Sequence, residues 1–309
     1  MRNIIIDCDP GHDDAIAILV ALANPEKLNL LAVTTIGGNQ TLNKVTKNAQ
    51  NILSYVHANV PLATGQEGPL VKSLNTAPEA HGETGMDGPY FKGNSYPIVS
   101  DNAVFYMYQT IMAQAERVTL VGLGPLTNIA LLLKTFPEVK SKIEMISIMG
   151  GGIRRGNMTA AAEFNIYVDP EAAKIVFSSG VPIVMSGLDV TEKAYVTIEE
   201  INALENGGEV HQLVYELLKF YNESGKQFGF EDSPIHDLCA ICYLLDSTMF
   251  KGKYYHVDVV TDDSITRGMT LADRRLKPAK ENNVLVLEEV NRSAYVHSLL
   301  QALVRLDNK

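Results

Sequence analysis

The sequence is poor in cysteine, with Cys8, Cys239 and Cys242 as the three residues of this type among 309. So few thiols provide no disulfide framework, which excludes the small secreted proteins that disulfides hold together. Cys239 and Cys242 follow His236 as a Cys-x-x-Cys pair, a spacing used by zinc sites and redox proteins. The pair lacks a second pair of ligands and lies in the apolar segment LCAICYLL. We therefore expect both thiols to pack in a core helix.

Positive charge is also scarce. The chain has 26 Lys and Arg against 36 Asp and Glu, a formal net charge of -10, and no long basic block. This balance argues against binding to nucleic acid or to an anionic membrane surface. The substrate need not be cationic, because a bound divalent metal would reverse the local sign of the charge.

Long apolar runs are missing as well. None reaches the roughly 18 to 20 residues of a membrane-spanning helix, and the residues before the first aspartate are too few for a signal peptide. We therefore expect a cytoplasmic protein. The hydrophobic fraction of 46% is enough for a substantial core. No Pro- or Ser-rich linker divides the chain, so we expect residues 1–309 to form one domain.

The most informative stretch is residues 2–19, RNIIIDCDPGHDDAIAIL. Its β-branched start predicts a strand buried on both faces, with Asp7 and Asp9 at the carboxyl end. Asp13 and Asp14 follow a Pro-Gly pair and precede an apolar run typical of a helix. This order of strand, acidic loop and helix places the carboxylates where ligands bind in an open α/β sheet.

These four carboxylates repel one another. At an effective dielectric constant of about 20, two charges about 4 Å apart cost roughly 4 kcal/mol, and a helix N-terminus offsets only about 0.3 to 2 kcal/mol. The acids could point apart into solvent, be protonated, or surround a hard cation with oxygen ligands. Two adjacent acids are commonly no more than helix N-terminal residues. Asp9, four residues earlier at a strand end, favours a metal site here.

Strands and helices alternate over residues 1 to about 190. After the first strand, we predict strands at 28–35, 61–64, 118–121, 143–149 and 181–185, and helices at 15–22, 41–55, 102–115, 126–136 and 170–178. This rhythm predicts an α/β fold with an open, mostly parallel, doubly wound sheet flanked by helices. The last third is more helical, with helices at 210–221, 237–245 and 293–306 and strands at 254–260 and 284–287. Residues 65–97 form a connection of the length typical of a lid, a binding loop or disorder.

Further candidates lie near other strand ends. Asn39 follows the second strand, and the turn after residue 121 lets the Leu123 carbonyl face a ligand. His81 lies among glycines in HGETGMDG, within the long connection. Residues 150–157, GGGIRRGN, lack the Lys-Ser/Thr of a phosphate loop and the spacing of a dinucleotide site. We expect these glycines to let the backbone approach a small ligand.

Asn157, Glu163 and Asn165 form a set that suits a polyol, because a carboxylate accepts hydrogen bonds from hydroxyls and an amide both donates and accepts. A helix cap or turn explains any one of them equally well, but three in one loop system favour binding. Asp237 could be a further acidic metal ligand, with His236 beside it as a proton donor or polar contact. Such a pair at a helix start is more often a cap, and only the acidic stretch at residues 2–19 favours the metal interpretation.

Together these segments resemble one family. In chain order they are DCDPGHDDA, GNQT, HGETGMDG, VGLGPLTN, MGGG, AAEFNIYVDPEAA and PIHD, and they span nearly the whole chain. The set is similar to the ribonucleoside hydrolases of the inosine-uridine-preferring type, most of all to the bacterial pyrimidine-preferring branch. The resemblance implies the nucleoside hydrolase fold, a bound Ca²⁺, a homodimer or homotetramer, and hydrolysis of the N-glycosidic bond of a ribonucleoside to ribose and free base.

The resemblance also implies roles position by position. It assigns calcium binding to Asp9, Asp14, Asp237 and the carbonyl of Leu123, where the family often has Thr. It assigns ribose contacts to Asp13, Asn39, Asn157, Glu163 and Asn165, with Met149 beside the sugar. The residues near the leaving base would be His236 and, as in the pyrimidine-preferring branch, His81. Residues 227–233, QFGFEDS, should wall the base pocket but match less well, so a non-specific or inosine- or purine-preferring enzyme is the alternative.

In the implied mechanism, Asp9 accepts a proton from a water activated by the metal, which attacks C1′ of the ribose. His236, helped by His81, stabilises or protonates the departing base. Two other classes are open. A haloacid-dehalogenase-like phosphotransferase would use Asp7 as nucleophile, although its motif has Thr or Val where this chain has Gly11. A non-catalytic nucleoside- or ribose-binding protein could use the same polyol contacts, but such proteins are usually exported.

Overall fold

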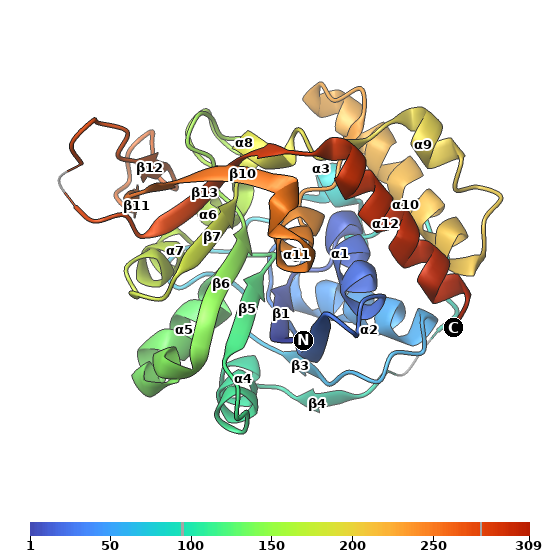
Figure 1. Ribbon diagram of the computed structural model, residues 1–309, viewed down its shortest axis with the longest axis horizontal. Coiled ribbons are helices and arrows are strands. Elements are labelled where there is room, and N and C mark those ends of the chain that lie inside the picture. Colours follow the sequence, from blue (N-terminus) through green and yellow to red (C-terminus); the bar gives the residue numbers. More distant parts are fainter. Residues whose placement is uncertain (94–95, 279) are drawn as a thin grey trace.

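A nine-stranded sheet crosses the molecule in this computed structural model, which describes residues 1–93, 96–278 and 280–309 (Figure 1). Its strands are β1 (Arg2–Cys8), β2 (Leu28–Thr35), β3 (Leu62–Thr64), β4 (Ile98–Ser100), β5 (Val118–Gly122), β6 (Ile143–Met149), β7 (Ile183–Ser186), β10 (Phe250–Tyr255) and β13 (Val284–Val290). They are arranged in the order β10-β13-β7-β6-β5-β1-β2-β3-β4. β10 pairs antiparallel with β13 at one edge, and the other neighbouring strands of this sheet are parallel.

The central strand β1 follows directly from its sequence. Ile4, Ile5 and Ile6 are fully buried, and the strand pairs with β2 on one side and β5 on the other. Ile4 and Ile6 belong to the hydrophobic core on one face of the sheet, and Ile5 belongs to the core on the opposite face. The run of β-branched residues therefore forms the doubly buried strand that was predicted.

Helices cover both faces of the sheet (Figure 1). One layer holds α1 (His12–Leu22), α2 (Leu42–Tyr55), α10 (Glu209–Gly225), α11 (Leu238–Leu245) and α12 (Arg292–Asp307). The other holds α4 (Ala103–Met112), α5 (Thr127–Thr135) and α7 (Pro170–Phe177). This arrangement confirms the doubly wound α/β fold, and α10, α11 and α12 supply the predicted helices of the last third.

Short elements complete the fold. They are the helices α3 (Pro78–His81), α6 (Phe164–Val168), α8 (Leu188–Thr191) and α9 (Ile198–Asn202), the 3₁₀ turns Pro137–Lys142, Lys226–Phe228 and Ser247–Met249, and the strand pairs β8 (Tyr195–Val196) with β9 (Ser233–Pro234) and β11 (Val257–Val259) with β12 (Thr270–Ala272). Among the described residues, no helix combines the length and the apolar composition needed to cross a bilayer.

The prediction of one strand at 254–260 is wrong. This segment is divided between β10 and β11, because β10 pairs with β13 whereas β11 pairs with β12 in a separate small sheet. The start of β10 has little apolar signal, since most of its residues are exposed at the edge of the large sheet. The long connection at 65–97 contains the one-turn helix α3, and its residues 94 and 95 lie outside the described residues.

Candidate active site

A cavity of about 570 Å³ opens at the carboxyl ends of the central strands. Its volume is in the range of pockets that bind small molecules. The lining includes ten of the residues singled out from the sequence, namely Asp13, Asn39, His81, Leu123, Met149, Asn157, Glu163, Asn165, His236 and Asp237. The remaining two, Asp9 and Asp14, lie buried beneath this surface. Segments far apart in the sequence therefore meet at one site, as the strand-end argument predicted.

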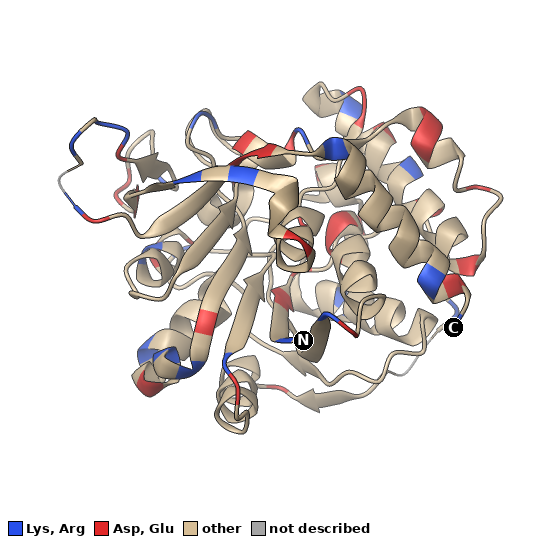
Figure 2. Ribbon diagram, in the orientation of Figure 1, with Lys and Arg blue, Asp and Glu red and all other residues tan. Residues whose placement is uncertain are grey.

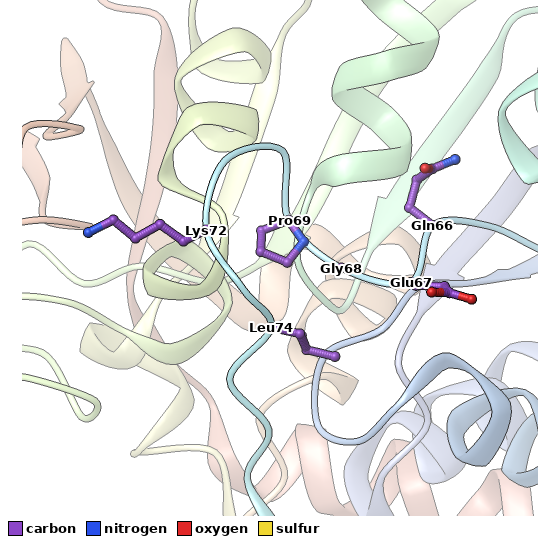
Figure 3. Close-up of a pocket in the computed structure, with 6 residues that line it drawn as sticks. All are labelled: Gln66, Glu67, Gly68, Pro69, Lys72 and Leu74. Carbon is purple, nitrogen blue, oxygen red and sulfur yellow. The ribbon is translucent and has the colours of Figure 1, made fainter.

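A second, shallow hollow lies on the connection between β3 and α3, lined by Gln66, Glu67, Gly68, Pro69, Lys72 and Leu74 (Figure 3). None of these six residues is buried. In Figure 3 the side chains of Gln66 and Lys72 point in opposite directions, so they do not converge on a common ligand position. We therefore place the active site in the larger cavity.

Three carboxylates converge at the floor of the cavity. Helix α1 begins at His12, so Asp13 and Asp14 lie in its first turn, and Asp237 directly precedes α11. One oxygen from each of Asp13, Asp14 and Asp237 lies within 4.8 Å of the others. The group includes Asp13, to which the resemblance gives a ribose contact, and it does not include Asp9. The carboxylate of Asp14 also accepts a hydrogen bond from the Gly11 amide at 2.9 Å, as an acid in the first turn of a helix does.

Asp9 lies just beyond β1 and is fully buried. Its Oδ2 accepts a hydrogen bond from the backbone amide of Asn39 at 2.6 Å, but its Oδ1 has no hydrogen-bond partner in the described part of the chain. A Cβ atom at Gly38 or Gly124 would come within 2.0 or 2.5 Å of the Asp9 oxygens, so both positions need glycine to leave room for the carboxylate. A buried acceptor of this kind is suited to an ion or a water as its partner.

Burial raises the pKa of all four acids, with mutual repulsion as a further cause for Asp9, Asp13 and Asp237. The pKa reaches about 6 for Asp14 and about 7 for Asp13, and it lies well above the usual range for Asp9 and Asp237. Figure 2 shows acidic colouring at the start of α1, in the interior, whereas most Lys and Arg lie on peripheral helices and loops. The oxygen donors, their burial and the unpaired Asp9 oxygen fit a hard divalent cation.

Asn157, Glu163 and Asn165 line the cavity, and their hydrogen bonds join the glycine-rich loop to the strand ends. Glu163 is the N-cap of α6, and its carboxylate accepts hydrogen bonds from the backbone amides of Asn165 and Gly151 at 3.0 and 2.8 Å. The side-chain amide of Asn165 donates to the carbonyl of Leu123 at 2.8 Å, and Asn157 Oδ1 accepts from the Phe164 amide at 2.9 Å. Glu163 is therefore a helix cap and, like Asn157 and Asn165, part of the cavity wall, while the binding of a polyol by these residues stays a prediction.

Two histidines line the cavity. His236 Nδ1 lies 2.8 Å from the Thr191 hydroxyl, and His81 Nδ1 lies 3.2 Å from Nδ1 of His12. Burial lowers the pKa of His236 to about 4, with the charge of Arg155 as a smaller cause, and it lowers the pKa of His81 well below the usual value. Both rings are therefore neutral at neutral pH in the free protein.

The structure also identifies residues that the sequence did not single out. Tyr221 lines the cavity and stacks on His12 and His81 at ring-centroid distances of 5.4 and 5.5 Å. The sequence predicted only that Tyr221 ends a helix, because an aromatic residue on an apolar face indicates a core position. Phe228 and Phe230 also line the cavity, so part of the segment 227–233 forms its wall, and the contact of this wall with the base stays a prediction.

Two other features of the sequence have structural roles. Cys239 and Cys242 are fully buried and unpaired, which confirms their prediction as core residues of α11. Asp7 is buried and accepts hydrogen bonds from the Thr34 hydroxyl at 2.6 Å and from the Asn128 amide at 2.8 Å. It is not among the described residues that line the cavity. The phosphotransferase alternative therefore lacks its predicted nucleophile, Asp7, in the cavity lining.

The chain matches known proteins over nearly its whole length. Residues 4–297 match the profile of the family described as inosine-uridine preferring nucleoside hydrolase. The chain is 47% identical to the pyrimidine-specific ribonucleoside hydrolase RihA of Shewanella sp. (strain MR-7), over 98% of this chain and 96% of that protein. It is 44% identical to RihA of Escherichia coli (strain K12), over 97% of each chain.

Solved structures give the same result for the fold. The purine-preferring ribonucleoside hydrolase from Gardnerella vaginalis superposes with a TM-score of 0.92 at 26% identity, covering 99% of both chains. The plant nucleoside hydrolase PpNRh1 superposes with a TM-score of 0.89 at 30% identity, covering 98% of both chains. Together with the buried acidic cluster under a polar cavity, these matches show that the chain belongs to the inosine-uridine preferring nucleoside hydrolase family and is a ribonucleoside hydrolase.

Proposed function

We propose that this enzyme hydrolyses the N-glycosidic bond of pyrimidine ribonucleosides, such as uridine and cytidine, to ribose and free base with the help of Ca²⁺. The observation that carries the proposal is the cluster of buried carboxylates beneath a cavity lined by side chains that suit a polyol, with an Asp9 oxygen that has no partner in the described part of the chain. The pyrimidine preference is supported by the names of the RihA relatives, at 44% to 47% identity.

The second candidate is a non-specific or purine-preferring nucleoside hydrolase. It is supported by the name of the Gardnerella vaginalis structure, which superposes over nearly the whole chain but at only 26% identity. The assembly into a homodimer or homotetramer and the cytoplasmic location stay predictions.

In this proposal Asp9, Asp14, Asp237 and the carbonyl of Leu123 would hold the cation, and Asp13 would contact the ribose. When bound, Ca²⁺ lowers the pKa of water and neutralises the carboxylates. Asp9 would accept the proton of the attacking water at Oδ1, the oxygen without a hydrogen-bond partner among the described residues. Attack falls on C1′ of a ribose with oxocarbenium character.

The other polar side chains orient the sugar. Asp13, Asn39, Asn157, Glu163 and Asn165 supply acceptors and amide donors for its hydroxyls, and all five line the cavity. Fixing C1′ against the nucleophile in this way can supply roughly 7 to 11 kcal/mol. A nucleoside without the 2′-hydroxyl loses part of this orientation.

The function is tested by incubating the purified enzyme with uridine, cytidine, inosine and 2′-deoxyuridine and measuring reducing sugar. We expect ribose from uridine and cytidine at a higher kcat/KM than from inosine, and little release from 2′-deoxyuridine. A higher kcat/KM for inosine would support the second candidate. Saturable binding of uridine without release of ribose would identify a binding protein and contradict the proposal.

The leaving group is assigned to His236. Its Nδ1 contacts the Thr191 hydroxyl, which leaves Nε2 as the ring nitrogen available to the departing base. We expect His236→Ala to lower kcat for uridine by about 100-fold, at the lower end of the effect of a positioned proton-transfer group. The loss should be much smaller with a nitrophenyl riboside, whose leaving group needs no proton. An equal loss on both substrates would remove His236 from this role.

Glu163 should make substrate binding depend on pH. Burial raises its pKa to about 7, so the carboxylate that accepts a hydrogen bond from a ribose hydroxyl forms as the pH rises. Between about pH 6 and pH 8 the ionised fraction grows from about one tenth to about nine tenths, so we expect KM for uridine to fall by up to about tenfold. Glu163→Gln should abolish this component of the pH profile. A KM that rises over this range in the wild type, or an unchanged profile in the variant, would contradict the assignment.

A further inference from the structure

His12 lies behind the cavity wall, in the first turn of α1, and is fully buried. Its ring lies in a stack of aromatic rings, 5.0 Å from Phe220 with an interplanar angle of 4° and 5.4 Å from Tyr221 with an angle of 10°. The edge of the His12 ring contacts His81, which lines the cavity, with 3.2 Å between the two Nδ1 atoms. The stack fixes the plane of the His12 ring, so its two nitrogens have defined neighbours.

These neighbours determine which nitrogens carry hydrogen. His12 Nε2 lies 2.8 Å from the backbone carbonyl oxygen of Asp87, and because a carbonyl only accepts, Nε2 must be the protonated nitrogen. The neutral His12 ring then has its lone pair on Nδ1. The hydrogen bond between the Nδ1 atoms requires His81 to donate from Nδ1, which leaves the lone pair of a neutral His81 on Nε2.

The surrounding chain holds both rings in this contact. The Asp87 carboxylate accepts hydrogen bonds from the amides of Glu83 and Thr84 at 3.0 Å each, and the Asp87 amide donates to the His81 carbonyl at 3.2 Å, so the Asp87 carbonyl has a fixed position. On the other side, a Cβ atom at Gly11 would lie 2.5 Å from His81 Nδ1. Glycine at this position lets the two histidines meet.

We propose that His12 is a positioning residue that fixes His81 in its Nδ1–H tautomer and directs the Nε2 lone pair into the cavity, where it accepts a hydrogen bond from an N–H group of the base. The proposal rests on the proposed function of this site. In the described residues, His81 Nε2 has no hydrogen-bond partner, and the residue lines the cavity. His81 is then an acceptor that recognises the base, and proton donation to the leaving group is left to His236.

The tautomer can be observed without any substrate. In ¹⁵N-labelled enzyme, long-range ¹H–¹⁵N correlation spectra distinguish the two neutral forms of each imidazole, and His81→Gln and His12→Gln assign the signals by their loss. We expect the Nε2–H form for His12 and the Nδ1–H form for His81. The Nε2–H form for His81 would overturn the proposal, whatever the enzyme does with uridine.

Matched variants separate recognition from a structural role. His12→Asn keeps an acceptor near the position of Nδ1, facing His81, whereas His12→Gln keeps a donor near the position of Nε2, facing Asp87. We expect the Gln variant to raise KM for uridine about tenfold, the effect of about one hydrogen bond, and the Asn variant to stay near the wild type. With a nitrophenyl riboside, which has no base N–H, both should keep the wild-type KM, and this also shows that they fold.

Equal KM values of the two variants for uridine, or a lower value for the Gln variant, would overturn the proposal, because His12 would then serve only to hold the Asp87 loop. These outcomes are distinct from failure of the proposed function, which would appear as no release of ribose by the wild-type enzyme.

Discussion

Replacing Asp9 by alanine should lower kcat for uridine by at least about 10³-fold, within the range of effects of a general base and enlarged by the loss of a cation ligand. The folded state should not suffer. Burial holds the pKa of Asp9 well above its usual value, so the carboxylate is costly to keep charged in the interior without a cation. We therefore expect the Tm of the metal-free Asp9→Ala variant, measured by circular dichroism, to equal or exceed that of the metal-free wild type.

Asp7→Asn is the matched control. Asp7 lies on the same strand, two residues before Asp9, and is also buried. Its Oδ1 accepts hydrogen bonds from Thr34 and Asn128, and an asparagine carbonyl oxygen can accept both in the same place. We expect this variant to keep wild-type turnover. An Asp9→Ala enzyme with more than about a tenth of the wild-type kcat would contradict the base role, because a general base alone contributes about 10²-fold or more.

The sequence was sufficient to predict structure where buried apolar residues and a candidate catalytic residue occur in the same short segment. Ile4 to Ile6 are buried from both sides of the sheet, so their apolar character alone predicted the central strand and placed Asp9 at its end. The same reasoning placed Asn39 and Leu123 after strands, and both line the cavity because parallel strands end at the same edge of a sheet.

Contacts between distant segments were harder to predict. Nothing in the local sequence shows that Tyr221, late in α10, stacks on His81 in the connection after β3, because this contact depends on how α10 packs against α3. The edge strand β4 was missed because Ile98 and Val99 are half exposed and lack an alternating pattern. The contact between His12 and His81 likewise needs the observed rotamers and the Asp87 carbonyl, and no spacing in the sequence specifies these.

Removing the metal should abolish turnover of uridine and lower the Tm. The carboxylates of Asp13, Asp14 and Asp237 lie within 4.8 Å of one another, so without a cation they repel or take up protons. A ligand that binds only the folded state at about 100 times its Kd stabilises that state by about 2.7 kcal/mol, which for a chain of this size corresponds to a Tm shift of about 5 °C. We expect this shift when Ca²⁺ is added back to chelator-treated enzyme, together with recovery of activity.

Asp237→Asn should lose the Ca²⁺-dependent Tm shift as well as the activity, because it removes one of the converging charges and gives the cation a weaker ligand. Asp263→Asn is the control, since this acid is exposed on the surface and pairs with Lys72, and it should keep both. Mg²⁺ should restore less than Ca²⁺, because it demands near-ideal octahedral geometry and retains its waters. Full turnover by enzyme that elemental analysis shows to be metal-free would contradict the role of the cation. The buried carboxyl groups of Asp9, Asp13, Asp14 and Asp237 would then tolerate one another by protonation alone, and Asp9 would have to activate the catalytic water without a cation.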